Sequence, residues 1–167
     1  MFEQTVPYFI KMLKNLDALM GKAVAHADRK KFDVNVLVGL RLTPDMLAFS
    51  NQIQFACDTA KFCTANLTGK TAPKHEDNEK TWTELRERIK KTQTYLETFG
   101  PEQFAKASDA KVSPAWAEGK WLPAKEYVNE VAIPNFYFHI SMAYAILRQA
   151  GVEIGKSDYM GELKFRA

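Results

Sequence analysis

Residues 122–151 read LPAKEYVNEVAIPNFYFHISMAYAILRQAG, and this stretch decides the fold. Its apolar residues recur at spacings of three and four, which predicts one long helix. They form two sets about half a turn apart, so the helix must be covered on two sides, by the C-terminal tail or by a second copy of the chain. Pro134 lacks an N–H and crowds the carbonyl of Glu130, so we expect a bend there. The first set, apolar apart from its Asn and its closing Gln, is Val128, Val131, Asn135, Phe138, Met142, Ala145 and Gln149. The second set is Ile133, Phe136, Ile140, Tyr144 and Leu147.

Two polar side chains, Asn135 and His139, lie one turn apart just after the proline. Together with the freed carbonyl of Glu130 they form a polar group inside an apolar helix. Such a group suits a ligand or a metal ion, but it also describes a kink whose polar atoms satisfy one another or a buried water. We favour the kink.

Three further helices are predicted upstream from apolar stripes and end signals. The first covers residues 5–27. The second covers residues 43–68 and opens with Thr43-Pro44-Asp45, a cap, a first-turn proline and a first-turn acid. The third covers residues 79–99, and its inward stripe holds no titratable group. Residues 70–78 between them read as a polar loop in which His75 faces solvent.

Two connections carry most of the remaining information. Residues 28–42 form a long apolar connection between the first two helices, which we expect to cross the bundle. Residues 101–121 form an ordered loop before the last helix, either a small hairpin or an ordered cap. Trp116 and Trp121 in this loop either wall a pocket at the mouth of the bundle or, more simply, anchor the loop.

The second helix also carries polar residues at every seventh position, namely Asp45, Gln52 and Thr59. This spacing places Gln52 at the edge of the buried face, looking into the bundle, with Asp45 nearer the helix end. The candidate ligand-binding residues are therefore Asp45, Gln52, Asn135, His139, Trp116 and Trp121.

Composition limits the class of protein. The 167 residues, 46% hydrophobic and 26% charged, are enough for one domain, which we place at residues 1–167. The net charge is +3 and the basic run Arg29-Lys30-Lys31 is short, which argues against nucleic-acid binding. No apolar stretch is long enough to span a membrane, and the N-terminus lacks a secretory signal, so we expect a cytoplasmic protein. Cys57 and Cys63 are predicted to be buried free thiols.

Four segments together resemble a known family. RLTPDM at 41–46, NQIQFACDTAK at 51–61, PNFYFH at 134–139 and AYAILRQAGVEIG at 143–155 are similar to those of an uncharacterised bacterial family, domain of unknown function 1993. This family is placed in the DinB-like, YfiT-like superfamily of four-helix bundles. The resemblance implies an all-α, up-and-down four-helix bundle, with a long connection between helices 1 and 2 and an ordered loop before a Pro-kinked helix 4.

The resemblance also implies a site. Many DinB-like proteins bind a divalent metal ion through three histidines, and some are thiol-dependent transferases or hydrolases. His139 falls on the second histidine of the pair in the last helix, Asn135 on the first, and Gln52 near the histidine of the second helix. Because amides are much poorer ligands than imidazole for zinc-like ions, we expect no metal and no cofactor. A weakly bound divalent ion, zinc or nickel, is the alternative.

These residues and the resemblance together suggest three functions. The first is a non-enzymatic homodimer, formed through helix 4 and the tail, with a small-molecule cleft near Gln52, Asn135 and His139. The second is a diverged metal-dependent transferase or hydrolase in which His139 binds the ion, helped by Asp45, Gln52 or a water. The third makes His139 a general base without metal. We favour the first.

Overall fold

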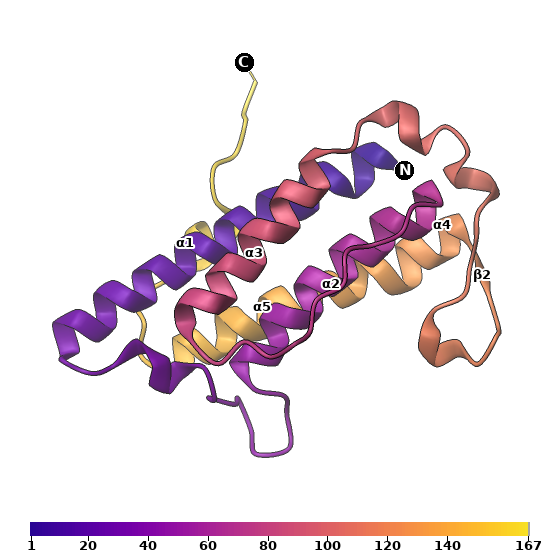
Figure 1. Cartoon of the computed structure of the whole chain (residues 1–167). Helices are drawn as coiled ribbons and strands as arrows, with labels where there is room; N and C mark the ends of the chain where they lie inside the picture. The colour runs from indigo at the N-terminus through magenta and orange to yellow at the C-terminus, as the bar shows by residue number, and fades with distance from the viewer. Residues whose placement is uncertain (167) are drawn as a thin grey trace.

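The computed structural model describes residues 1–166 and is an all-α four-helix bundle (Figure 1), as the sequence predicted. Its long helices are α1 (Val6–Lys30), α2 (Phe49–Thr68), α3 (Trp82–Glu97) and a composite last helix of α4 (Ala124–Glu126), the π-helical turn η6 (Tyr127–Ala132) and α5 (Ile133–Gln149). The shorter elements are α6 (Lys156–Met160), the strands β1 (Lys111–Val112) and β2 (Leu122–Pro123), and the 3-10 turns η1 (Phe2–Gln4), η2 (Val34–Leu37), η3 (Pro101–Phe104), η4 (Ala107–Asp109) and η5 (Ala115–Ala117). Within residues 1–166, no helix has both the length and the apolar character needed to cross a bilayer.

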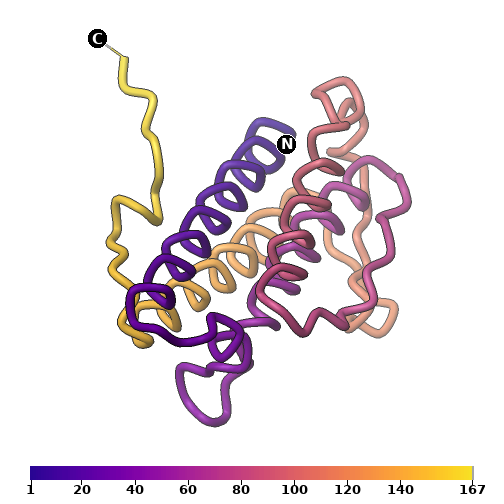
Figure 2. Tube along the Cα trace, turned by 60° about the vertical axis from the view of Figure 1, so that its left-hand side comes forward, coloured from indigo at the N-terminus to yellow at the C-terminus, as the bar shows by residue number. Residues whose placement is uncertain are grey.

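The helices do not simply alternate in direction. The chain between α2 and α3 returns along the length of the bundle, so these two helices run parallel (Figures 1 and 2). Phe49 and Trp82, which open them, stack with ring centroids 4.9 Å apart. At their far ends the Lys70 ammonium lies 4.8 Å from the centroid of Phe99. Helix α2 therefore packs against both α3 and α5, and most of the site is built on it.

The second helix begins later than predicted. Its N-cap is Ala48, and Thr43-Pro44-Asp45 forms a turn in which the Thr43 hydroxyl donates to Asp45 Oδ1 (2.6 Å). The first amides of α2, on Phe49 and Ser50, donate to carbonyls of the long connection instead (2.8 and 3.1 Å). A proline flanked by Thr and Asp suits a β-turn as well as a helix start, so this signal was ambiguous. As a result Asp45 is exposed and does not look into the bundle.

The predicted irregularity in the last helix lies next to Pro134. The six residues of η6 are wound as a π-helix, and α5 begins one residue before the proline. At the second position of α5 the missing N–H breaks no bond of that α-helix. A π-helical turn followed by a new α-helical segment thus accommodates Pro134, whose missing N–H and ring were expected to disturb the helix at the Glu130 carbonyl.

The C-terminal segment covers one of the two apolar sides of the last helix. Helix α6 packs on α1, on the opposite side of the bundle from the hairpin (Figure 2). Tyr159 packs edge-on against Tyr144 with centroids 5.7 Å apart, and its hydroxyl lies 3.0 Å from that of Ser141. The other side remains open, and Phe138 on it is 50% exposed.

Candidate functional site

A polar seam of four residues, Gln52, Thr59, Asn135 and His139, joins α2 to α5. His139 Nδ1 lies 2.8 Å from Gln52 Oε1, and Asn135 Nδ2 donates to the Thr59 hydroxyl (2.7 Å). The seven-residue spacing on α2 thus predicted two residues that face the last helix. The predicted cluster of Gln52, Asn135 and His139 is not formed, because Asn135 is exposed and bonds to Thr59 instead.

The tautomer of His139 follows from its partner. Gln52 Nε2 donates to the carbonyl of Leu47 (3.1 Å), so Gln52 Oε1 is the atom that faces the imidazole. An oxygen only accepts, hence His139 Nδ1 carries the proton and Nε2 keeps its lone pair. The rings of Phe55 and Phe138 flank the imidazole at centroid distances of 5.2 and 5.3 Å. Burial lowers the pKa of His139 to about 4, so the ring is neutral at pH 7.

This burial predicts a pH dependence of stability. Between the usual histidine pKa of 6.5 and about 4, the unfolded chain binds a proton at His139 that the folded chain does not. Stability should therefore fall as the pH drops through this range, by at most about 1.4 kcal/mol per pH unit for this group. Urea unfolding at pH 7, 6 and 5 checks this, and the His139→Asn variant should show a flatter dependence. Equal slopes for the two proteins would contradict the prediction.

A cleft of about 350 Å³ opens beside the seam, between α2, the last helix and the loop after β1. We call it the aromatic cleft, because Phe55, Phe62, Trp116 and Tyr127 line it. Its volume is within the range of small-molecule sites. The remaining lining residues are Asp58, Thr59, Asn66, Ser113, Pro114, Ala115, Val131, Ala132 and Asn135. The structure therefore brings two of the six predicted residues, Asn135 and Trp116, into one cavity.

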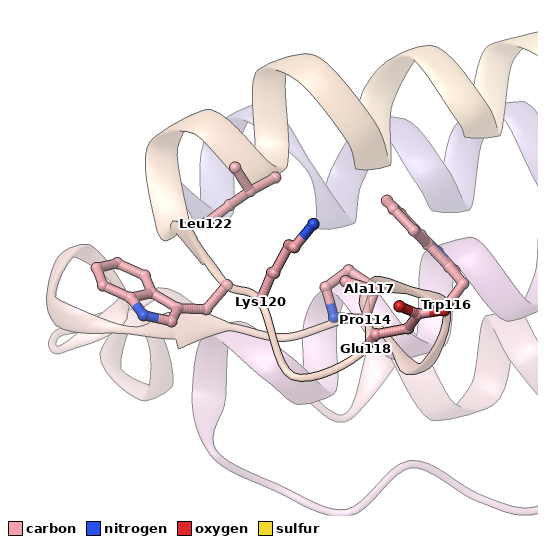
Figure 3. Close-up of a pocket in the computed structure, with 7 residues that line it drawn as sticks. Pro114, Trp116, Ala117, Glu118, Lys120 and Leu122 are labelled. Carbon is pink, nitrogen blue, oxygen red and sulfur yellow. The ribbon is translucent and has the colours of Figure 1, made fainter.

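The two tryptophans do not anchor the loop. Trp116 is 71% exposed and Trp121 is 50% exposed. Both line a second cavity of about 510 Å³, whose lining residues all come from the loop between Pro114 and Leu122 (Figure 3). The Lys111 ammonium lies 4.5 Å from the centroid of Trp121. Trp116 lines both cavities. Of the two interpretations drawn from the sequence, pocket wall and loop anchor, the first describes these tryptophans.

The donor set does not fit the three-histidine metal site. His139 is the one imidazole near the seam, and Gln52 directs its oxygen at the protonated nitrogen of that ring. The Asn135 amide nitrogen is bonded to Thr59. Within residues 1–166, no group of three or more His, Cys, Asp or Glu side chains is placed to hold a metal ion. One imidazole with neutral amides is a weak donor set for zinc-like ions.

A buried charged cluster between α2 and α3 was not predicted. Arg88, only 2% exposed, lies 2.7 Å from Asp58, 2.8 Å from Asp77 and 2.8 Å from Glu79. Lys61, also buried, lies 2.8 Å from Asp58. The third helix therefore does offer an inward titratable group. The spacing of Arg88, three residues after Leu85 and four before Thr92 in the buried stripe, is the sequence signal that could have predicted its inward direction.

The cluster fixes the chain that connects α2 to α3. His75, predicted to face solvent, is half-buried with Nδ1 3.8 Å from Asp58 Oδ1, and burial lowers its pKa. Burial alone would raise the pKa of Glu79, but hydrogen bonds from Gln54 and Arg88 outweigh it and hold that pKa below its usual value. The cluster is therefore a set of paired charges of which only Asp77 is exposed.

Comparisons with known proteins agree with the geometry. A family model described as a domain of unknown function, DUF1993, matches residues 1–160. A crystal structure of a DinB family member protein from Shewanella denitrificans is 49% identical, covers 99% of this chain and 94% of its own, and has a TM-score of 0.95. No curated protein matches the chain. Both matches agree with the resemblance drawn from the sequence.

Proposed function

The chain belongs to the DUF1993 family of domains of unknown function, and on that premise we propose that it is a non-enzymatic, homodimeric DinB-like bundle that binds a small molecule without an intact metal site. The observation that carries this proposal is the aromatic cleft beside α2, which Trp116 and Asn135 both line. Aromatic walls with a few polar groups are typical of small-molecule sites.

The surroundings of the two thiols and of His139 support binding rather than catalysis. Cys57 and Cys63 are buried, and burial raises the pKa of each thiol to about 12, so neither supplies a thiolate at neutral pH. Within residues 1–166, His139 Nδ1 is bonded to an amide and not to a carboxylate that would strengthen it as a base. The residues of the polar seam are therefore better suited to position a ligand than to react with it.

A fragment screen tests the binding function. We expect fragments observed by ligand-detected NMR to compete for one site and to lose binding in Trp116→Ala. The matched control is Trp121→Ala, which removes the same side chain from the neighbouring cavity and should leave the cleft intact. A screen whose hits are all insensitive to Trp116 would refute a ligand site in the aromatic cleft.

The open side of the last helix supports the homodimer. Phe55 and Phe138 flank His139. The carbonyl of Leu47 accepts a hydrogen bond from Gln52, and Met142 follows Phe138 by one turn of α5. We call Leu47, Phe55, Phe138 and Met142 the uncovered face. The first three are exposed, and none of the four carries a charge. Faces rich in aromatic residues and Met and poor in charge are typical of interface cores, and such a face meets its own copy without charge repulsion. The tail is already seated on α1, so the dimer we propose uses α2 and α5 and not the tail.

Light scattering tests the dimer. We expect a dimer mass at micromolar concentration, and a monomer mass for Phe138→Lys, because a buried ammonium would have no partner across the interface. Tyr8→Lys on α1, at a similarly exposed aromatic residue outside the uncovered face, should remain a dimer. A monomeric wild-type protein would exclude the interface.

One observation favours the metal-dependent alternative. His139 holds its Nδ1 proton against an oxygen and leaves Nε2 free, which is the arrangement of histidines that bind metal ions. Isothermal titration with zinc or nickel separates the two functions. We expect no micromolar binding, whereas micromolar binding that disappears in His139→Ala would replace our proposal with a diverged DinB-like metal site.

A further inference from the structure

We propose that the aromatic cleft binds a small organic cation with N–H donors, such as an alkyl- or arylalkylammonium ion. This inference rests on the proposed binding function and names the chemistry of the ligand. It follows from three properties of the lining residues: their aromatic faces, their charge and the direction of their hydrogen-bonding atoms.

The aromatic faces come from separate parts of the fold. Phe55 and Phe62 lie seven residues, or two turns, apart on α2, Tyr127 begins η6, and Trp116 stands on the loop after β1. Aromatic rings attract cations through their negative faces, and several rings around one site form the cages that bind ammonium groups. Phe62 already shows this contact, since the buried Lys61 ammonium lies 4.7 Å from its centroid.

The charge of the lining residues favours cations over anions. No Lys, Arg or His is among the residues that line the aromatic cleft, and the one charged residue is Asp58. Arg88 and Lys61 both approach Oδ1 of that carboxylate, at 2.7 and 2.8 Å. Its Oδ2 accepts no hydrogen bond from any residue between 1 and 166. The residues that line the cleft therefore carry one carboxylate, with Oδ2 not engaged by Arg88 or Lys61, and no cationic side chain of their own.

The amide of Asn135 is oriented by its neighbours. The Thr59 hydroxyl donates its single proton to the carbonyl of Phe55 (2.7 Å), so it can only accept from Asn135. Asn135 therefore directs Nδ2 at Thr59 (2.7 Å) and keeps Oδ1 free as an acceptor. Two free acceptors, Asn135 Oδ1 and Asp58 Oδ2, then lie among residues that line one aromatic cleft. A ligand that brings N–H donors and a positive charge matches them, whereas a quaternary ammonium ion would leave both without a donor.

Three matched compounds test the ligand class. Benzylamine, cationic at pH 7, benzyl alcohol and benzoate share one ring and differ in charge. We expect titrations followed by protein NMR to show benzylamine binding about tenfold more tightly than benzyl alcohol, and no binding of benzoate. Trp116→Ala and Asn135→Leu should each weaken benzylamine several-fold, whereas Trp121→Ala should leave it unchanged. Both replaced side chains are exposed, so these variants should fold.

The outcomes separate this inference from the proposed function. If benzyl alcohol or benzoate binds as tightly as benzylamine, and Trp116→Ala abolishes that binding, the cleft is a ligand site but the cation assignment is wrong. If benzylamine binds equally well to the wild-type protein and to Trp116→Ala, its binding site lies outside the aromatic cleft and the inference fails. If neither these compounds nor any fragment binds in a Trp116-dependent way, the proposed function fails with it.

Discussion

Replacing Arg88 with methionine is expected to lower the free energy of unfolding by about 3–5 kcal/mol, because it removes the central cation of a buried cluster. Asp58 and Glu79 would remain inside with less compensation, and both are largely buried. Methionine keeps the unbranched stem of arginine, so the change acts mainly through charge and hydrogen bonds. Thermal unfolding should show a lower Tm by roughly 2–4 °C for each kcal/mol lost.

The matched control for this change is Arg86→Met on the same helix. Arg86 makes a two-bond ion pair with Asp17 (2.6 and 2.9 Å), but both side chains are partly exposed. Pairs of this kind contribute about 1 kcal/mol or less. Equal destabilisation by Arg88→Met and Arg86→Met would show that the buried cluster contributes no more to stability than a partly exposed ion pair.

The buried cluster also makes stability depend on pH. Because hydrogen bonds hold the pKa of Glu79 below its usual value of 4.5, the contribution of Glu79 to stability is present above pH 4.5 and is lost as the pH falls further.

Replacing Phe136 with alanine is expected to cost about 3–5 kcal/mol, the usual range for removing a buried phenylalanine. Phe136 is fully buried two residues after the proline and packs on Phe9 with ring centroids 4.5 Å apart. It joins α5 to α1 at the point where the last helix changes from π to α. The cavity left behind would therefore loosen the junction between η6 and α5, which positions Asn135 and His139.

Phe138→Ala is the control, since it removes the same side chain from the open side of the same helix. Its ring is half-exposed, and the loss should be under about 1 kcal/mol. Urea titrations of both variants at one submicromolar concentration measure the difference without a contribution from dimer formation. Similar losses at positions 136 and 138 would mean that the two sides of the helix are wrongly assigned.

The sequence predicted the four helices because long apolar stripes dominate their packing. The predicted apolar stripe of α3 is buried, with Arg88 as an added member, and α2 ends at Thr68 as predicted, where Gly69 takes a left-handed conformation. It did not predict where α2 begins, because Thr43-Pro44-Asp45 satisfies two local structures and only tertiary hydrogen bonds decide between them. Nor did it predict that α2 and α3 are parallel, since direction depends on the path of a polar connection that has no periodicity.

Site residues were predictable where helical spacing sets their direction. Gln52 and His139 were placed correctly inside the bundle, and both are buried. Asn135, one turn from His139, points elsewhere, because a single turn on a helix aligns two residues only approximately and the Thr59 hydroxyl offered a partner. Arg88 was missed because a charged residue in a buried stripe needs acids from other segments, and these lie 9 to 30 positions away in the sequence.

The polar seam also sets the register of the last helix. Sliding α5 by one turn along α2, about 5.4 Å, would leave most of the apolar contacts replaceable by others of the same kind. It would separate Gln52 from His139, however, and a buried amide oxygen and imidazole N–H without partners would cost about 1–3 kcal/mol each. A single polar residue specifies the alignment of coiled coils in the same way. The hydrogen bond between Gln52 and His139 thus selects one alignment of α5 on α2 among several that hydrophobic packing alone would accept.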